Sequence, residues 1–458
     1  MAFVSQRGKE LLTDEYGYVY TCNNKNKDGT KVYWVCCKRF CNVRVHTVNA
    51  NITFRSDIHC HAADQSRSAA HSAISAMLNA AETTQNSTRN ILSDGVQNVD
   101  EQTAAAMPSK STLCRRIQRA RRRVNPTPPI PTVRHGFDIP DKYRYTADGK
   151  QFLLWDSGRD DINRILAYCS EEGLDLLLNK PHWFCDGTFK ASPDIFYQIF
   201  SLHVYISGAV VPVLYAMLPN KTRETYVRLL TKLSEMRDFH PESILTDFET
   251  AILSAFSDVF PDAARTGCFF HFSQCIFRQV QQHGLVTDYA VPEFSIFVRM
   301  LAAFAFVPEK DVITSFETLI DVEYPDRAEA IIDYFEDNFI GMKDRRGVRK
   351  SPSFPVALWN VSQRLADALP RTNNSVEGWH NGFQRTLMCS HPSVWKLIEK
   401  LQEERLQKFA TTQLLAGQTC PTKKVYRISN DRIATIVKDY HNRTTLDYLR
   451  NIAHNLTF

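Results

Sequence analysis

Two cysteines and two histidines near the N-terminus have the residue types and the spacing of a metal site. Four residues separate the two cysteines, and 17 more precede a His-Cys-His triplet. Two thiolates and two imidazoles form the closed tetrahedral donor set that suits Zn²⁺. The predicted ligands are Cys36, Cys41, His59 and His61. Cys37 and Cys60 remain rivals, each one position from a predicted ligand, and unrelated surface cysteines and histidines are the alternative.

Three acidic residues could hold a second kind of metal ion. Asp186 and Asp247 each close a short apolar run, and Glu377 is a third candidate. Carboxylates at the ends of neighbouring strands bind hard cations such as Mg²⁺ or Mn²⁺, and two such ions would hold both oxygens of a phosphodiester displacement. Each acid has a structural alternative. The aspartates could be turn or cap residues, and Glu377 could complete a capping box with Asn374 as the N-cap.

Two further pairs of residues lie close to these acids in the sequence. Cys268 and His271 form a Cys-x-x-His pair, which is half of a zinc site, and both residues could also be buried without a metal. Glu377 and His380 form a Glu-x-x-His pair. A di-iron site needs a second such pair, and the sequence contains none.

A cluster of arginines predicts contact with a polyanion. Six arginines fall within nine positions of an expected helix, residues 111–123. Neutralised phosphates release counterions, so this helix predicts salt-dependent binding to DNA. A nuclear localisation signal and an ordinary solvated face are the alternatives. With the helices before it, the segment could also form a helix-turn-helix in which it is the recognition element. The DNA-binding candidates are Arg115, Arg116, Arg119, Arg121, Arg122 and Arg123.

Short alternating runs around the first site predict a small antiparallel sheet. These runs are residues 18–20, 32–35, 43–45 and 52–54. A sheet of about sixty residues buries too little apolar area to be secure alone, so a bound metal would supply the missing folding energy. Helix-like runs follow at 73–81 and 111–123, and the proline-rich segment 126–131 predicts a stiff linker.

From about residue 150 the pattern predicts an α/β domain that carries the three acids. The expected strands are residues 183–187, 196–206, 210–218, 243–247 and 266–270. An amphipathic helix is expected at 222–237 and a further helix at about 250–260. After about residue 273 the pattern is nearly all helical, and no internal repeat is present in the sequence.

Composition and charge limit the class of protein. The 458 residues predict two or three folded units, and 43% hydrophobic with 23% charged residues exclude a mainly disordered or fibrous chain. Twelve cysteines are too sparse for a disulfide scaffold. Residues 1–135 carry 19 basic and 10 acidic residues, whereas the remainder carries 36 basic and 40 acidic residues. This asymmetry again predicts that the N-terminal part binds a polyanion. The longest apolar run is broken by Pro212, so we expect an intracellular protein without a membrane segment.

The N-terminal region resembles the FLYWCH zinc finger. The motifs that carry the resemblance are Phe3-Val-Ser-Gln-Arg-Gly-Lys-Glu-Leu-Leu12, Gly17-Tyr18, Tyr33-Trp34-x-Cys36, Cys41-x-x-Arg44 and His59-x-His61. The resemblance implies a zinc-bound β-sheet that contacts either DNA or protein.

The larger region, about residues 150–410, resembles the MULE transposase domain of Mutator-like elements. The motifs, in the order of the family, are Asp186-Gly-Thr-Phe189, Ile244-Leu-Thr-Asp247, Cys268-x-x-His271 and Thr372-Asn-Asn-x-x-Glu377 with His380. The resemblance implies an RNase H-like core with a helical insertion at about 273–370. It also implies that Asp186, Asp247 and Glu377 are catalytic acids that bind Mg²⁺ or Mn²⁺, with Cys268 and His271 as an accessory motif.

We therefore predict a multidomain α+β protein. Its expected parts are a finger at residues 1–64, a helical arginine-rich region at 65–135, the transposase domain at 150–410 and a helical tail at 411–458. Many relatives carry another Cys-rich motif near the C-terminus, whereas only Cys389 and Cys420 follow Glu377 here. We expect a nuclear transposase, or a derivative of one, that acts on double-stranded DNA as a homo-oligomer and has no small-molecule substrate. The alternative is a non-catalytic DNA-binding protein that retains the fold.

Overall fold

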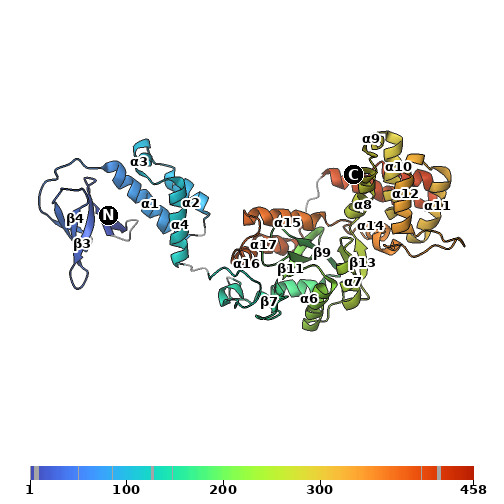
Figure 1. Ribbon diagram of the computed structural model, residues 1–458, viewed down its shortest axis with the longest axis horizontal. Coiled ribbons are helices and arrows are strands. Elements are labelled where there is room, and N and C mark those ends of the chain that lie inside the picture. The colour runs from blue at the N-terminus through green and yellow to red at the C-terminus, as the bar shows by residue number, and fades with distance from the viewer. Residues whose placement is uncertain are drawn as a thin grey trace. The chain divides into compact units, whose positions relative to one another are not determined.

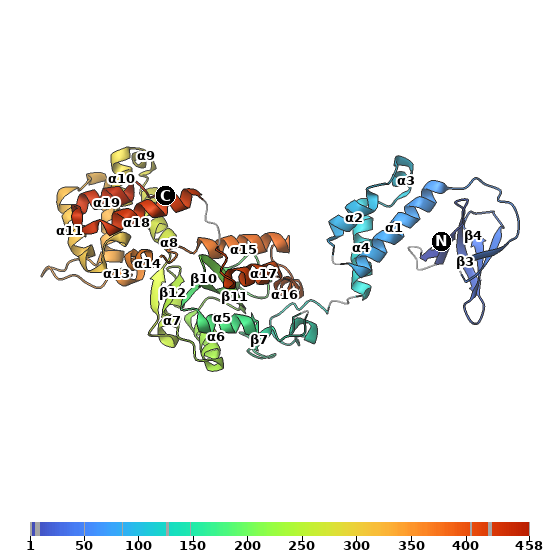
Figure 2. The same ribbon diagram turned by 180° about the vertical axis from the view of Figure 1, so that it is seen from behind.

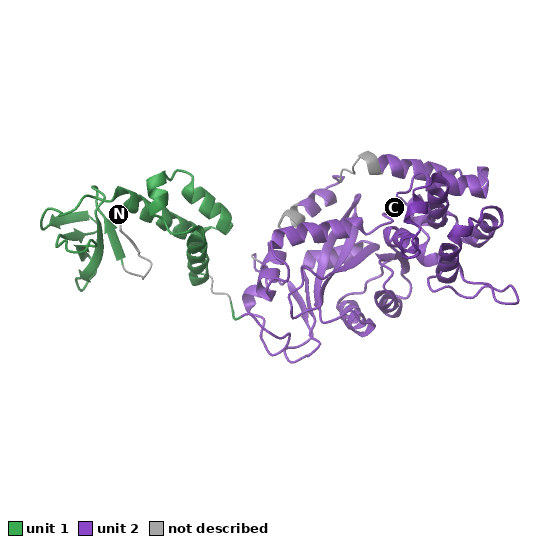
Figure 3. Ribbon diagram, turned by 45° about the horizontal axis from the view of Figure 1, so that its top comes forward, with its two compact units in different colours: residues 1–129 green, residues 130–458 purple. Residues whose placement is uncertain are grey.

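The computed structural model describes residues 2–4, 10–49, 51–84, 86–124, 128–146, 148–403, 405–419 and 424–457. The chain divides into two compact units, residues 1–129 and 130–458 (Figure 3). Each unit is described by itself. Parts of the first FLYWCH-like motif, the start of the proline-rich linker and Cys420 lie outside the described residues.

The first unit begins with a six-stranded antiparallel sheet whose strands follow the order of the sequence. Its strands are β1 (Ala2–Val4), β2 (Glu10–Thr13), β3 (Val19–Lys25), β4 (Lys31–Cys36), β5 (Arg44–Val48) and β6 (Asn51–Arg55). The four runs predicted as strands overlap β3 to β6, and two of them begin one residue before the strand. Alternating residues of these strands, among them Tyr20, Trp34 and Val45, form a small buried core. The indole of Trp34 donates a hydrogen bond to Thr47 Oγ1 at 2.9 Å.

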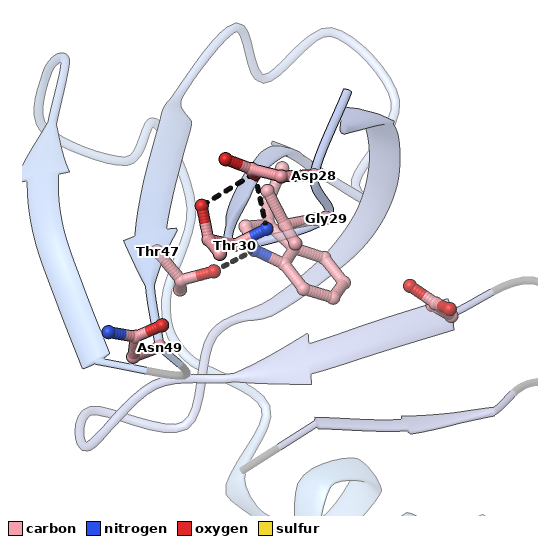
Figure 4. A pocket seen from close by; sticks show the side chains of 8 residues that line it. Asp28, Gly29, Thr30, Thr47 and Asn49 are labelled. Carbon is pink, nitrogen blue, oxygen red and sulfur yellow. Dashed lines mark hydrogen bonds between the residues drawn. The ribbon is translucent and has the colours of Figure 1, made fainter. Parts of the chain in front are cut away.

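A shallow pocket lies on this sheet at the turn between β3 and β4 (Figure 4). In the turn, Asp28 accepts hydrogen bonds from the backbone and the hydroxyl of Thr30, at 3.0 and 2.7 Å. The lining residues are Glu10, Asp28, Gly29, Thr30, Val32, Trp34, Thr47 and Asn49. None of these eight is a predicted zinc ligand.

Four helices complete the first unit: α1 (Gln65–Thr83), α2 (Thr88–Val96), α3 (Glu101–Ala106) and α4 (Lys110–Val124). The side chains of Asp64, Ser87 and Asp100 cap the first three at their N-termini. The helices enclose a separate apolar core that contains Ile74 and Ile117. Helix α4 agrees with the expected helix at 111–123, and α1 is longer than the expected run at 73–81.

The second unit contains a mixed sheet, part of which is labelled in Figure 1. Its seven strands lie in the order β13-β12-β9-β10-β11-β8-β7. Its strands are β7 (Leu153–Asp156), β8 (Leu166–Cys169), β9 (His182–Thr188), β10 (Gln198–Ile206), β11 (Ala209–Leu218), β12 (Ser243–Thr246) and β13 (Ala264–Gly267). Strands β9, β12 and β13 are parallel to one another, and the remaining pairs are antiparallel. Parallel β9 and β12 therefore present their carboxyl ends at the same edge of the sheet.

The prediction of a strand over residues 266–270 is wrong in its second half. Strand β13 ends at Gly267, and helix α8 (Phe269–Gln282) begins two residues later. Phe269, Phe272 and Ile276 recur at helical spacing and are buried. The apolar Cys-Phe-Phe sequence extends the strand pattern into this helix, so the two types of element could not be separated there from the residues alone.

Helices cover both faces of the mixed sheet (Figure 1). Helices α5 (Glu171–Asn179), α6 (Arg223–Met236) and α7 (Thr250–Val259) pack on one face, and α15 (Asn374–Leu387) and α16 (Val394–Gln402) on the other. Trp183 lies in the first of these two cores, and Tyr215 and Trp395 lie in the second. Helix α17 (Arg405–Leu415) follows α16 in the sequence.

A helical body is inserted between β13 and α15 (Figure 2). After α8 it contains α9 (Val286–Tyr289), α10 (Pro292–Ala303), α11 (Val312–Val322), α12 (Glu329–Phe335), α13 (Val356–Trp359) and α14 (Ser362–Ala366). Helices α18 (Lys424–Lys438) and α19 (Thr445–Ala453), from the segment expected to be a tail, pack into the same core. Tyr448 of α19 donates a hydrogen bond to Phe306 O at 2.6 Å. The helical character expected after residue 273 is confirmed, and none of the described helices has the length and apolar character needed to span a bilayer.

Candidate functional site

The structure brings the four predicted zinc ligands together. Cys36 ends β4, Cys41 lies in the following loop, and the two histidines follow β6. Their donor atoms all lie within 4.8 Å of one another. Cys36 Sγ is 3.2 Å from His61 Nε2, and Cys41 Sγ is 3.3 Å from His59 Nδ1. The rival cysteines, Cys37 and Cys60, are exposed.

Hydrogen bonds fix which nitrogen of each imidazole faces the thiolates. His61 Nδ1 contacts Ala62 O at 2.7 Å, which leaves Nε2 for a metal. His59 Nε2 lies 2.8 Å from the hydroxyl of Tyr20, and that hydroxyl donates to Asp14 Oδ2, also at 2.8 Å. Because the hydroxyl gives its proton to the carboxylate, it accepts the Nε2 proton of His59. The Nδ1 lone pair of His59 is then free to bind a metal.

The electrostatics of this cluster prepare one of its two thiols for Zn²⁺. Burial raises the pKa of the Cys36 thiol to about 11. Burial raises the pKa of the Cys41 thiol, but hydrogen bonds from the backbone of Val43 and Cys60 outweigh it and lower that pKa to about 7. Burial lowers the pKa of His59, so its imidazole is neutral at pH 7. A thiolate and a neutral imidazole are the forms that coordinate zinc. The ring of Tyr18 stacks on His59 at 3.7 Å between centroids and holds its plane.

The three predicted acids come from separate elements and meet at the carboxyl edge of β9 and β12. Asp186 is in β9, Asp247 directly follows β12, and Glu377 is in the first turn of α15. His271 links two of them: its Nδ1 is 2.8 Å from Asp247 Oδ1 and its Nε2 is 3.7 Å from Glu377 Oε1. His380 Nδ1 lies 3.3 Å from Asp186 Oδ2.

The capping box considered for Glu377 is not formed. Helix α15 begins at Asn374, so its N-cap is Asn373, and that side chain makes no capping hydrogen bond. Instead, Asn373 Nδ2 donates to Cys185 O at 3.1 Å and to Asp247 Oδ1 at 3.3 Å. The asparagine thus ties α15 to the strand edge, and the Glu377 carboxylate faces His271.

We call Asp186, Asp247 and Glu377, together with the adjacent His271 and His380, the acidic centre. Charges in this centre shift one another's pKa values. Burial raises the pKa of Glu377, and Asp186 and Asp247 raise it further against the opposing effect of His271. Burial lowers the pKa of His271, but contacts with Asp247 and Cys268 outweigh it and raise that pKa to about 10. Carboxylates that repel one another would gain from a bound cation, and carboxylate oxygens are donors that Mg²⁺ or Mn²⁺ would require.

Two segments of the chain match known families. Residues 3–61 match the family model of the FLYWCH zinc finger domain. Residues 182–275 match the family model of the MULE transposase domain. Both resemblances predicted from the motifs are confirmed, in the predicted order. The MULE match includes Asp186, Asp247 and the Cys-x-x-His pair and ends before Glu377. A comparison with curated proteins finds no match to this chain.

The second unit contains a buried hydrogen-bond relay that the sequence did not reveal. Asp186 of β9 pairs with Ser201 of the neighbouring strand β10. Ser201 Oγ is 3.0 Å from His380 Nε2 and 2.8 Å from His203 Nε2. The His380 imidazole, whose Nδ1 lies beside Asp186, is therefore held in place through its other ring nitrogen, Nε2. Two polar residues at alternate positions of an otherwise apolar strand were the signal that could have revealed it.

The arginines of α4 divide into two groups. Leu113 and Ile117 face the helical core, and three arginines share the exposed opposite face at positions i, i+4 and i+7. We call these three the basic face: Arg115, Arg119 and Arg122. The other three arginines are less available to a partner. Arg116 is half-buried, Arg121 donates a hydrogen bond to Asn86 O, and Arg123 forms an ion pair with Glu82.

Proposed function

We propose that this protein is a DNA transposase of the Mutator-like DDE class, or a descendant of one, that cuts and joins DNA strands. One observation carries the proposal. Asp186, Asp247 and Glu377, which are 61 and 130 positions apart in the sequence, converge around two histidines at one sheet edge. The MULE match over residues 182–275 supports the same reading.

The strand order supports an RNase H-like core as part of this proposal. The central strands run β13-β12-β9-β10-β11, with an antiparallel meander from β9 to β11 followed by two parallel strands. Helix α6 connects β11 to β12, and helix α7 connects β12 to β13. This arrangement places the first two acids on adjacent parallel strands, which a shared site requires.

In the proposed reaction, Asp186, Asp247 and Glu377 would hold the divalent ions. Such ions, when bound, activate an attacking oxygen and stabilise the leaving oxygen of a phosphodiester. The protein's own part is orientation. Gly187 N donates to Asp186 Oδ1 at 2.7 Å, His380 lies against Oδ2, and Asn373 donates to Asp247. Each aspartate is thus restrained before substrate arrives, which lowers the cost of reaching the reactive geometry.

The first unit would bind DNA. Its basic face fits the phosphate backbone, and a three-residue connection, 107–109, joins α3 to α4, as in a helix-turn-helix whose second helix is the reading helix. The zinc-type cluster of the finger would stabilise the adjacent sheet. The proposal includes a nuclear location and a homo-oligomeric state, which microscopy of a tagged chain and light scattering would test.

A strand-cleavage assay tests the catalytic part. The purified full chain is incubated with Mg²⁺ or Mn²⁺ and labelled duplexes that carry the inverted repeats flanking its gene. We expect nicked and joined products, reduced about 100-fold or more in Asp186→Asn, Asp247→Asn and Glu377→Gln, the scale of removing one preorganised electrostatic interaction. Asp238→Asn is the matched control, because that side chain is 92% exposed. DNA affinity should not change in any of the four.

One observation favours the second candidate, a non-catalytic DNA-binding protein. His271 already contacts Asp247 and Glu377, so two of the three acids have a cationic partner without any metal. Cleavage by Asp247→Asn at the rate of the parent, or no cleavage by the parent on its own flanking repeats, would favour this candidate and contradict the proposed catalysis.

A further inference from the structure

A group of mixed donors lies within the acidic centre. A carboxylate oxygen of Asp247, the thiol of Cys268 and an imidazole nitrogen of His271 all lie within 4.8 Å of one another. The backbone places them there. Cys268 N donates to Thr246 O at 2.8 Å, so the start of α8 is fixed beside the end of β12. Sequence spacing alone offered two ligands, and the fold adds the third.

The chemistry of this group differs from that of the three acids. Mg²⁺ prefers oxygen donors and retains bound water, so a buried sulfur beside an imidazole is a poor site for it. Zn²⁺ binds sulfur, nitrogen and oxygen together, and sites with three protein ligands leave a fourth position for water. The set of Asp247, Cys268 and His271 therefore selects an ion of the zinc class.

The thiol is held in position for coordination. Cys268 is fully buried, and its sulfur accepts a hydrogen bond from Asn373 N at 3.2 Å. It is also the N-cap residue of α8, a helix of 14 residues. The positive end of the helix dipole favours a negatively charged ligand at that position.

The imidazole is oriented in the same way. His271 Nδ1 is buried and lies 2.8 Å from Asp247 Oδ1. In a tetrahedral zinc site, nitrogen and oxygen ligands about 2.0–2.2 Å from the ion lie about 3.4 Å apart, so a small movement of either side chain would admit the ion. The opposite nitrogen, Nε2, faces Glu377 Oε1 at 3.7 Å. A carboxylate behind a metal-binding imidazole is the usual outer contact that fixes its orientation.

We propose that Asp247, Cys268 and His271 bind one Zn²⁺ ion, with Glu377 as the outer carboxylate that orients His271. An ion at this site would bind Asp247 directly and would hold Glu377 through its contact with His271. Zinc would then compete with the divalent ions of the cleavage reaction and inhibit it. This inhibitory role rests on the proposed function, whereas zinc binding itself does not.

Zinc stoichiometry of the full chain tests the site. Protein stripped by a chelator is titrated with Zn²⁺ against a chromophoric competitor. We expect two equivalents per chain, one in the finger and one here. Cys268→Ser and His271→Gln should each weaken one equivalent by more than about 100-fold, because even a change in an outer contact costs 10–100-fold. Glu377→Gln should weaken the same equivalent by about 10–100-fold.

A matched variant assigns each equivalent. Cys41→Ser should weaken the finger equivalent and leave the second one unchanged. With Co²⁺ in place of Zn²⁺, the Cys41→Ser chain should retain sulfur-to-metal absorption that disappears when Cys268→Ser is added. The proposal is overturned by a single equivalent in the parent chain, or by two equivalents that neither Cys268→Ser nor His271→Gln affects.

Failure of the proposed catalysis would be recognised separately. Asp186 is outside the mixed donor group, so Asp186→Asn should keep both zinc equivalents whether or not it cuts DNA. If cleavage is found, Zn²⁺ should inhibit it at concentrations that saturate the second site, and excess Mg²⁺ should reverse the inhibition. Inhibition that parallels occupancy of the finger alone would contradict the proposed competition.

Discussion

Removing one hydroxyl group from the finger should weaken its metal binding. Tyr20 is fully buried, and burial together with Asp14 raises the pKa of its hydroxyl, which therefore stays protonated. This hydroxyl is 2.8 Å from both Asp14 Oδ2 and His59 Nε2. Tyr20→Phe keeps the ring in the core and removes only the link that sets the tautomer of His59.

Two independent arguments give the expected change in the zinc affinity of the finger. A half-buried imidazole nitrogen left without its partner costs about 1–3 kcal/mol. At about 1.4 kcal/mol for each factor of ten, this is about 5–150-fold in zinc affinity. Removal of an outer contact to a metal-binding histidine typically costs 10–100-fold, which agrees. We therefore expect Tyr20→Phe to raise the zinc dissociation constant by about 10–100-fold.

The measurement is a competition titration with a chelator of known affinity, in a Cys268→Ser background so that only the finger binds zinc tightly. Tyr18→Phe is the control. It retains the ring that stacks on His59 and loses a hydroxyl that donates to His61 O at 3.3 Å, away from His59 Nε2. If Tyr20→Phe binds zinc within about twofold of Tyr18→Phe, the relay does not orient His59 and the reasoning is refuted.

Two further changes test the DNA interaction and the relay behind the acids. Replacing all three arginines of the basic face by alanine should lower the slope of log affinity against log salt for duplex DNA by about 3, one for each phosphate that is no longer neutralised. Arg123→Ala, whose guanidinium pairs with Glu82, should change the slope by less than about one, and equal slopes in parent and triple variant would contradict the proposed DNA binding by this face. Ser201→Ala should lower the free energy of unfolding by about 1–3 kcal/mol, because His203 and His380 are both deprived of a buried partner. Denaturant titration measures this, and a change equal to that of a partly exposed serine such as Ser234→Ala would rule it out.

Local patterns allowed the finger to be predicted well. Its strands alternate along short runs, and its four candidate ligands lie within 26 residues of sequence, so spacing alone limits how they can meet. Local geometry also favours Cys36 over Cys37 as the ligand, since neighbouring residues of a strand point to opposite faces. Cys36 is buried in the cluster and Cys37 is exposed, as that rule requires.

The acidic centre could be predicted only in part, because its contacts are non-local. The positions of Asp186 and Asp247 at strand ends followed from hydrophobic runs, but nothing in the residues alone set the distance of Glu377 from them. The resemblance supplied that link. The local alternative for Glu377, a capping box, failed because Asn373 uses its side chain for tertiary contacts with β9 and Asp247 rather than for its own helix.

The geometry around Cys268 explains how a large insertion can separate the second and third acids without moving them apart. The chain leaves the sheet at Cys268 and returns at Arg371, and Phe269 N donates to Arg371 O at 2.9 Å. Two residues further on, Asn373 N donates to the Cys268 sulfur. These bonds close the base of the insertion next to the acids. Because the entropy of closing a loop grows only slowly with its length, helices can be added beyond this point at little cost to the site. What the site requires from the insertion is the fixed pair of exit and entry points, and Cys268 supplies one of them while its sulfur remains available to a metal.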